Sequence, residues 1–368
     1  MNSYDKLIEL IDASDEETKQ IVICQLVNRG IDGLHLILNA IRNGSGNTGI
    51  ILRQAILQIK DPKIKYEMFA LLGDTNPYIR HTAYRVLSRY QDLDVVQILE
   101  EKIGSKSFND GILAAEAIGE GKHFNSLPIL RKNLESASDK KSIYYSYDLI
   151  LAIAYSMAQL GDGSALPYIL KLCEDKDPYV RLKSIELLKY FSGPEVFKAL
   201  KKALSRRNNE IRQDALDGLF FIGTKDAANL IWNLCKDKNL HISERAMYRL
   251  AQLTGKEVDI NDIAMGFDKW LERNKVILDN KYCYRLGQPI NVPSLVKTLT
   301  EDKPEYKQYR LLDEIFVITG NRFGKDPEIW FYVKEPDYKS LVNDWLKENE
   351  SKYINGKLYK FGFLQDII

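Results

Sequence analysis

The amino-acid sequence predicts an all-α solenoid, an array of antiparallel helix pairs with small β-hairpins in a C-terminal cap. Three observations predict it. The chain has 368 residues, more than one compact core usually holds, which suits several domains or one repeat array. Small residues recur with a period near 31 residues. Apolar residues at helical spacing fill the intervals, and strand patterns are nearly absent before residue 275.

The composition is that of a soluble, folded protein. Hydrophobic residues make up 45% of the chain and charged residues 28%, and 52 Lys and Arg against 51 Asp and Glu leave a net charge of +1. This hydrophobic share excludes wholesale disorder. A charge so close to zero excludes mechanisms that need a strong overall field, such as non-specific coating of nucleic acid.

A short motif marks the start of the second helix in several repeats. Residues 76–80 read Asn-Pro-Tyr-Ile-Arg, and residues 177–181 read Asp-Pro-Tyr-Val-Arg. Asn or Asp can cap the first amides of a helix, and proline at its first position has no amide to lose. A third copy at 209–215 keeps the apolar residue and the arginine without the proline. The motif therefore predicts helix starts at Pro77, Pro178 and near residue 209.

A small residue four positions after the apolar residue of this motif defines the repeats. The successive spacings are 31, 28, 31, 42, 28, 31 and 31 residues, which suit two helices and their turns. We expect each small residue to lie where two helices approach closely, and the step of 42 predicts an inserted loop at 135–141. The positions are Cys24, Ala55, Ala83, Ala114, Ser156, Ser184, Ala215 and Ala246.

The first helices of the repeats carry leucine or isoleucine along one stripe, which is typical of a helix that buries one face. Examples are predicted at residues 127–134, 166–172, 196–204 and 228–234. The second helices are then expected to line the concave side. We expect about eight such pairs in a right-handed superhelix.

These features resemble HEAT repeats of the short bacterial, phycobilisome-lyase type. The resemblance rests on the Asp/Asn-Pro-Tyr-(Val/Ile)-Arg start, the small residue three places after the arginine and the short period. It covers about residues 15–255 and extends weakly into the tail. It implies the fold, whereas the family contains scaffolds, lyase subunits and regulators. Several copies lack the arginine, namely those at Cys24, Ala55, Ala114, Ser156 and Ala246.

A different repetition occupies the last third of the chain. Residues 270–274, Trp-Leu-Glu-Arg-Asn, recur 75 positions later as Trp-Leu-Lys-Glu-Asn, and an offset of 65 pairs residues 253–255 with 318–320. The second copy is therefore ten residues longer, with the insertion around residues 323–327 and Trp330. The expected domains are a HEAT-like solenoid at 1–225, a helix-pair and hairpin module at 226–290, and its second copy, the C-terminal cap, at 291–368.

Each copy of this module is expected to end in a short hairpin. The Asn-Gly pair at 355–356 is a two-residue turn signal that would join strands at 351–354 and 357–361, and residues 279–280 are its weaker counterpart. Two glycines suit the C-caps of the preceding helices, Gly255 and Gly320.

No pattern of catalytic or metal-ligating residues emerges, so we expect no cofactor and no metal. The cysteines are at least 48 positions apart and are predicted to be core residues in a reducing compartment. The histidines are isolated. Residues 44–49 match a Gly-rich nucleotide pattern, but a predicted helix precedes them, which favours a turn between repeats. The residues concerned are Cys24, Cys173, Cys235 and Cys283, and His35, His81, His123 and His241.

The first residues of the sequence lack the pattern of a secretory signal. The longest nearly apolar run, residues 149–158, is about half of what a bilayer crossing needs. We therefore expect a cytoplasmic protein without membrane contact.

The most basic stretch of the chain is residues 198–212, which contains six basic residues and one acid, Glu210. It can be interpreted as a site for phosphate or an acidic partner, or as a solvated outer helix with a structural arginine, and the second interpretation is favoured. The basic residues are Lys198, Lys201, Lys202, Arg206, Arg207 and Arg212.

The concave face is the expected binding surface. Tyrosine, with 21 copies, offers stiff amphipathic contact area, although its rings can also fill gaps between repeats. The candidate partner-binding residues are His81, Tyr84, Arg85, Lys183, Glu186, Tyr190, Gln213 and Asp217. Structural roles are predicted for Arg80, Arg181, Arg212, Pro77, Pro178, Trp270 and Trp345.

The function expected from these observations is a non-enzymatic, monomeric scaffold or adaptor in a bacterial cytoplasm. It would bind a protein or peptide on the concave face, and the charge balance disfavours nucleic acid. Two alternatives stay open. One is an enzyme or enzyme subunit, either a DNA-repair glycosylase or a lyase-type chaperone for a chromophore, and the other is an immunity or regulatory protein that occludes a partner.

Overall fold

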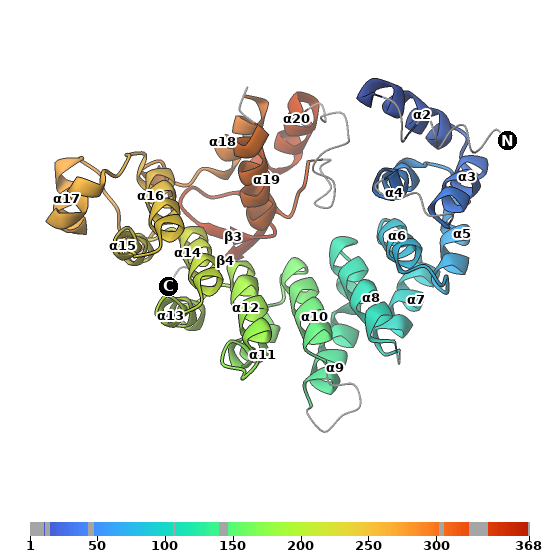
Figure 1. Cartoon of the computed structure of the whole chain (residues 1–368), viewed down its shortest axis with the longest axis horizontal. Coiled ribbons are helices and arrows are strands. Elements are labelled where there is room, and N and C mark those ends of the chain that lie inside the picture. Colours follow the sequence, from blue (N-terminus) through green and yellow to red (C-terminus); the bar gives the residue numbers. More distant parts are fainter. Residues whose placement is uncertain are drawn as a thin grey trace. The chain divides into compact units, whose positions relative to one another are not determined.

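The computed structural model describes residue 11 and residues 15–42, 48–105, 107–139, 146–301, 305–323 and 338–366 (Figure 1). Packing divides these residues into two units, with the boundary between Asn133 and Leu134. Within the described residues, strands occur only after residue 283. None of the described helices is both long and apolar enough to cross a membrane.

The first unit consists of helices arranged in antiparallel pairs. The helix α9 contains the boundary to the second unit. The helices are α2 (Glu16–Asn28), α3 (Ile31–Arg42), α4 (Thr48–Gln58), α5 (Ile64–Leu71), α6 (Pro77–Leu87), α7 (Leu93–Ile103), α8 (Phe108–Glu120), the 3-10 helix η1 (Phe124–Ser126) and α9 (Leu127–Ser138).

The second unit continues the pairs and adds the C-terminal elements. Its helices are α10 (Tyr147–Gln159), α11 (Leu166–Leu172), α12 (Pro178–Leu187), α13 (Pro194–Ala203), α14 (Asn209–Ile222), α15 (Lys225–Leu234), α16 (Leu240–Thr254), α17 (Phe267–Arg273), α18 (Val292–Lys297), α19 (Glu305–Thr319) and α20 (Tyr338–Asn349). The 3-10 helices are η2 (Gly163–Ala165), η3 (Leu188–Tyr190), η4 (Ile260–Met265), η5 (Thr298–Thr300) and η6 (Glu350–Lys352).

The second helices begin where the motif predicts. The side chain of Asn76 accepts a hydrogen bond from the Tyr78 amide (2.9 Å), and that of Asp177 accepts one from the Tyr179 amide (2.8 Å). Each cap is followed by proline at the first helical position, because this position needs no amide donor. The predicted helix 166–172 coincides with α11. The all-α solenoid of HEAT-like helix pairs is confirmed, whereas its handedness stays a prediction.

The small residues of the repeat lie at the packed contacts between helices, with one exception. Seven of the eight positions are fully buried. The two serines among them satisfy their hydroxyls inside their own helices, Ser156 on the Ala152 carbonyl (2.9 Å) and Ser184 on the Val180 carbonyl (2.6 Å). The prediction is wrong at Cys24, which is exposed because α2 buries Val22 and Ile23 instead.

The C-terminal hairpins turn at different residues from those predicted. Strand β1 (Tyr284–Arg285) pairs with β2 (Gln288–Pro289), and β3 (Leu358–Lys360) pairs with β4 (Phe363–Gln365), both antiparallel. The Asn-Gly pair at 355–356 does form a turn, closed by the Lys357 amide on the Ile354 carbonyl (3.2 Å), but it precedes the hairpin, so only its prediction as the hairpin turn is wrong. The actual turns are Leu286-Gly287 and Phe361-Gly362, with φ of 52°, 75°, 50° and 87°.

A helix end fixes each of these turns. The Leu286 and Gly287 amides donate to the carbonyls of Gln252 and Leu253 at the end of α16, both at 2.8 Å. The same bonds recur in the second copy of the module. There the amides of Phe361 and Gly362, 75 positions later, donate to the carbonyls of Val317 and Ile318, 65 positions later, at the end of α19, again at 2.8 Å. Each hairpin tip thus satisfies helix-end carbonyls that have no partner within the helix.

The duplicated tryptophans are buried in both copies. The side-chain amide of Asn274 donates to the Trp270 carbonyl at 2.9 Å, and Asn349 does the same to the Trp345 carbonyl at the same distance. Trp270 packs against Trp232, with ring centroids 5.3 Å apart. The shared bonds and offsets support a duplicated module. The domain boundaries at 225/226 and 290/291 stay predictions.

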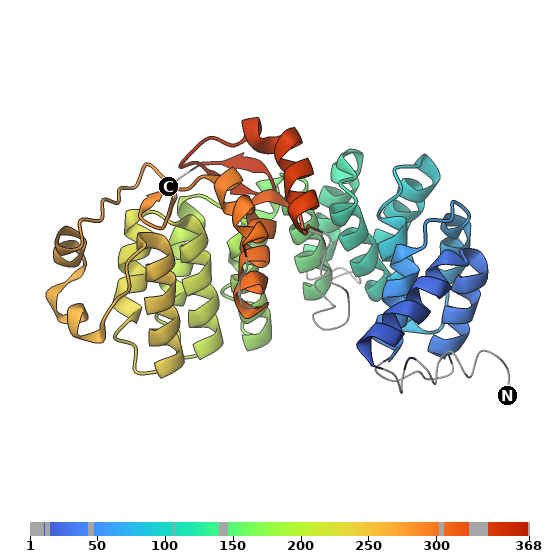
Figure 2. The same ribbon diagram turned by 90° about the horizontal axis from the view of Figure 1, so that it is seen from above.

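The C-terminal hairpin lies against the second helices of its own unit, and Figure 2 shows the red strands beside the green and yellow helices. The rings of Phe361 and Tyr190 are stacked, with centroids 5.3 Å apart and an interplanar angle of 18°. The Ser192 hydroxyl is 2.7 Å from the Gln365 side-chain oxygen. Part of the row formed by α10, α12, α14 and α16 is therefore covered by the chain itself.

Some predicted features lie mainly outside the described residues. They are most of the Gly-rich segment at 44–49, and the insertion at 323–327 and Trp330. The loop predicted at 135–141 is wrong at its start, because α9 continues to Ser138, and residues 140–141 lie outside the described residues.

Candidate functional site

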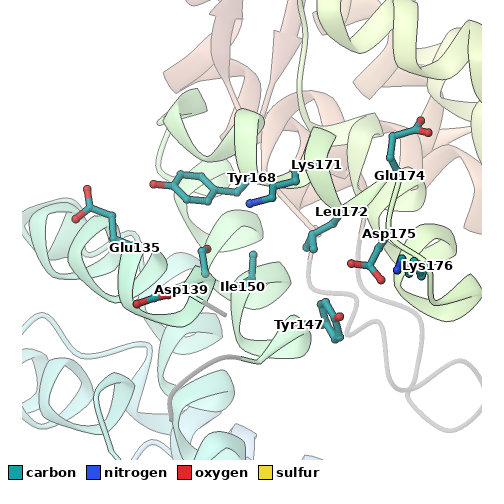
Figure 3. Close-up of a pocket in the computed structure, with 11 residues that line it drawn as sticks. Glu135, Asp139, Tyr147, Ile150, Tyr168, Lys171, Leu172, Glu174, Asp175 and Lys176 are labelled. Carbon is teal, nitrogen blue, oxygen red and sulfur yellow. The ribbon is translucent and has the colours of Figure 1, made fainter. Parts of the chain in front are cut away.

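A cavity of about 690 Å³ opens in the second unit between two consecutive repeats. The end of α9, the start of α10, α11 and the turn before α12 line it. Figure 3 shows Tyr168 and Lys171 together on α11, with Tyr147 on α10. The lining residues are Glu135, Ser138, Asp139, Tyr147, Ile150, Tyr168, Lys171, Leu172, Glu174, Asp175 and Lys176.

One wall of the cavity is held by ion pairs to the next repeat. Glu174 accepts hydrogen bonds from Lys202 (2.8 Å) and Arg206 (2.7 Å), and its side chain points away from the tyrosines in Figure 3. Burial opposes its ionisation, but these two cations outweigh that cost and lower the pKa of Glu174. The carboxylate therefore stays charged and serves to join the repeats.

The repeat arginines hold the turns between the two helices of a pair, and one of these turns lines the cavity. Arg181 donates from Nη1 to the carbonyls of Asp175 (2.7 Å) and Lys176 (2.9 Å). Arg80 makes the same bonds to the turn before α6, at 2.7 and 3.2 Å. Arg212 bonds to the Arg206 carbonyl (3.1 Å). Each arginine thus fixes the turn that precedes its own helix.

The basic segment at 198–212 is partly used by the fold. Lys202 and Arg206 bind Glu174, and Arg212 pairs with Asp237 at 3.1 Å. The structural interpretation therefore fits these three residues. The remaining basic residues of the segment are exposed, namely Lys198, Lys201 and Arg207.

The candidate partner-binding residues of the first unit lie on α6. Tyr84 is fully buried, and burial raises the pKa of its hydroxyl. Its ring is part of the core and cannot contact a partner in this structure. His81 and Arg85 are half-buried on the same helix, and their role stays a prediction.

The candidates of the second unit fall on α12, η3 and α14. Lys183 and Glu186 pair with each other at 2.9 Å. Tyr190 packs between Phe361 and Tyr155, whose ring centroid is 4.9 Å away. Gln213 and Asp217 are half-buried on α14. The fold therefore uses several of these side chains, and their role in binding a partner stays a prediction.

Acidic and basic side chains gather on the second helices α14 and α16. Asp217 receives hydrogen bonds from Arg245 and Arg249, which outweigh burial and lower its pKa. Asp214 has no such partner among the described residues. Burial and the neighbouring carboxylates of Glu186 and Asp217 raise the pKa of Asp214 to about 7. Among the described residues no group of three or more His, Cys, Asp or Glu side chains could hold a metal ion.

No sequence motif points to the cavity. Its central residues, Tyr147, Tyr168 and Lys171, belong to no motif. One sequence signal could have pointed to it. The repeat that contains α10 is longer than the others, since Ala114 and Ser156 are 42 residues apart. A cavity depends on how side chains of neighbouring repeats fill the space between them, and periodicity does not report that.

Several solved structures resemble the chain at low sequence identity. YibA of Escherichia coli is 16% identical, with a TM-score of 0.37, and the match covers 84% of this chain and 91% of that one. The complex of CpcE and CpcF of phycocyanin lyase from Nostoc sp. is 18% identical, with a TM-score of 0.36, covering 57% and 92%. At these values the likeness carries no argument about activity or partners. No curated protein matches the sequence significantly.

The comparison with protein families gives the assignment. The model described as HEAT repeats matches residues 145–219. This stretch runs from α10 into α14 and includes two motif arginines, Arg181 and Arg212, together with the cavity residues on α10 and α11. Residues 145–219 are therefore HEAT repeats, as the sequence motif predicts.

Proposed function

We propose that the chain is a non-enzymatic scaffold that binds an extended segment of a partner protein at the cavity of its second unit. One observation carries this proposal, the cavity of about 690 Å³ between two repeats with Tyr147, Tyr168 and Lys171 in its lining. Tyrosine is enriched at protein interfaces because its ring offers a large rigid contact and its hydroxyl can hydrogen-bond. A concave site with a few polar groups is the usual form of a binding pocket.

The way the cavity is held supports recognition by a rigid surface. Arg181 fixes the turn at Asp175 and Lys176, and Glu174 joins this turn to the next repeat through Lys202 and Arg206. A wall that is already ordered loses little entropy when a partner binds. The acids on this wall are engaged in structure, which favours binding over proton transfer.

The location differs from the concave face expected from the sequence. The hairpin β3–β4 already contacts α10 through Tyr155, and the segment after α12 through Tyr190 and Ser192. The cavity lies on the side where α11 turns into α12. We therefore place the partner there, in the cytoplasm of a bacterial cell as the sequence suggests.

Affinity capture from the native cell tests this proposal. The wild type would be compared with a double variant, Tyr168→Ala and Lys171→Glu, and with the control Lys198→Glu, an exposed lysine outside the cavity lining. We expect one protein to be enriched by the wild type and the control and to be reduced at least tenfold by the double variant. Equal enrichment by all three would place the partner elsewhere. Melting temperatures would show that each variant is folded.

A further inference from the structure

Three exposed cations lie in register on consecutive repeats of the second unit, and we call them the edge row. They are Lys176, Arg207 and Lys238, each 31 positions from the next. Each stands immediately before the capping residue of a second helix, α12, α14 or α16. We infer that the edge row binds an acidic segment of the partner protein with a carboxylate at about every third residue. This inference rests on the proposed function and names the chemistry of the partner.

The edge row has no acidic partner within the described part of the chain. No ion pair involves any of its three side chains there, whereas two acids of the same stretches are engaged by other cations. Glu174 binds Lys202 and Arg206, and Asp237 binds Arg212. These two acids are thus neutralised by cations outside the edge row, which itself stays without an ion pair among the described residues.

The surroundings of the edge row carry an excess of positive charge. The three equivalent stretches 171–181, 202–212 and 233–243 contain nine Lys and Arg against five Asp and Glu. The chain as a whole has a net charge of +1, so this excess is local. A local positive surface steers an acidic segment toward it and sets its register.

The repeat geometry sets the spacing of the expected carboxylates. Neighbouring packed helices lie about 8–10 Å apart, and α12, α14 and α16 run side by side (Figure 2). An extended peptide rises about 3.3 Å per residue. One repeat therefore corresponds to about three peptide residues, and acids at every third position would meet the three cations in turn.

The same edge favours a peptide over nucleic acid. Two exposed acids, Asp177 and Glu210, stand among the cations. A nucleic-acid backbone carries a charge at every nucleotide and would be repelled by these acids, whereas a peptide can place uncharged residues beside them. Tyr179, which is 56% exposed, adds an aromatic contact next to Lys176.

The edge row continues from the cavity, because Lys176 belongs to both. A partner segment that enters the cavity beside Tyr168 and Lys171 can therefore extend over Lys176 toward Arg207. The cavity would anchor the segment, and the edge row would select its sequence.

A synthetic peptide tests the inference. The probe is a fluorescein-labelled peptide of twelve residues with glutamate at every third position among glycine and serine. The comparison peptide has the same composition with its glutamates contiguous. Fluorescence anisotropy at low salt is expected to show tighter binding of the spaced peptide. Each of Lys176→Ser, Arg207→Ser and Lys238→Ser should weaken it about two- to fivefold, while Lys198→Ser, a matched exposed lysine on α13, should not.

Four results would overturn the inference. Equal affinity for the two peptides would show that the spacing of the glutamates does not matter. Equal affinity of the edge-row variants and the control for the spaced peptide would show that the edge row is not its binding site. Tighter binding of single-stranded oligo(dT) than of either peptide would replace the peptide with nucleic acid. If capture at the cavity succeeds while the peptide does not bind, only this inference fails and the scaffold function stands.

Discussion

The ammonium group of Lys360 donates a hydrogen bond of 2.6 Å to the backbone carbonyl of Lys189. Lys360 is 2% exposed and lies over the ring of Phe221, 5.0 Å from its centroid. In the first copy of the module the equivalent residue is Arg285, which has an ion-pair partner, Glu314. Lys360 therefore holds the C-terminal hairpin against the second helices, and no carboxylate of the described residues pairs with it.

This burial predicts a pH dependence of stability. Burial, with Arg285 and Lys189 nearby, lowers the pKa of Lys360 to about 7. Between about pH 7 and pH 10.5 the unfolded chain then holds a proton that the folded chain lacks, so stability rises with pH in this window. In urea unfolding of the wild type, the contribution of Lys360 to the free energy of unfolding should grow by about 1–3 kcal/mol from pH 7 to pH 9.5. Lys360→Met should remove this growth, and an unchanged slope in the variant would refute the assignment.

Asp214 predicts a dependence of the opposite sign. Its pKa in the folded chain is raised to about 7, mainly by burial. The folded chain binds this proton more tightly than the unfolded chain does. The resulting contribution of Asp214 to the free energy of unfolding is therefore fully present below about pH 4 and is lost as pH rises to about 7. Asp214→Asn should therefore stabilise the protein by about 1–2 kcal/mol at pH 8 and leave it nearly unchanged at pH 4. A uniform effect at both values would contradict this.

The ion pair between Arg285 and Glu314 predicts a large cost of truncation. Their side chains are 8% and 5% exposed. Glu314→Ala leaves a buried guanidinium without its partner and should cost about 3–5 kcal/mol in the free energy of unfolding. The exposed pair Lys347–Asp344 provides the control, since Asp344→Ala should have little effect. Equal losses in both variants would mean that burial does not govern the cost.

The duplicated tryptophans predict a destabilised C-terminal module. Trp270 and Trp345 are both in the core, and truncation to alanine should cost about 3–5 kcal/mol each. Lys269→Ala, next to Trp270 and exposed, is the control. Thermal unfolding measures all three, and a tryptophan variant that melts with the wild type would show that its ring is not packed as described.

Local chemistry made much of this fold predictable. The capping Asp177 and the following Pro178 determine where α12 begins, and a leucine stripe marks α11. The hairpin turns were not predictable in this way. Leu286 and Phe361 adopt positive φ because the ends of α16 and α19 accept their amides. The Asn-Gly pair at 355–356 forms its own turn ahead of the hairpin, so its local preference is met without setting where the hairpin turns.

The candidate site was less predictable than the fold. Tyr84 was expected to offer contact area to a partner, yet neighbouring helices bury it. Tyr168 carries no motif and lies in the cavity wall. The edge row was visible only in part, since Arg207 belongs to the basic segment whereas Lys176 and Lys238 acquire meaning only when the repeats are aligned.

Site-specific photo-crosslinking in the native cell tests the central claim most directly. A photoreactive phenylalanine analogue would replace Tyr168 in the cavity or Lys198 outside it. The scaffold account predicts one protein adduct of defined mass from position 168 and none from position 198. An adduct from position 198, or none from position 168 in a folded protein, would contradict it.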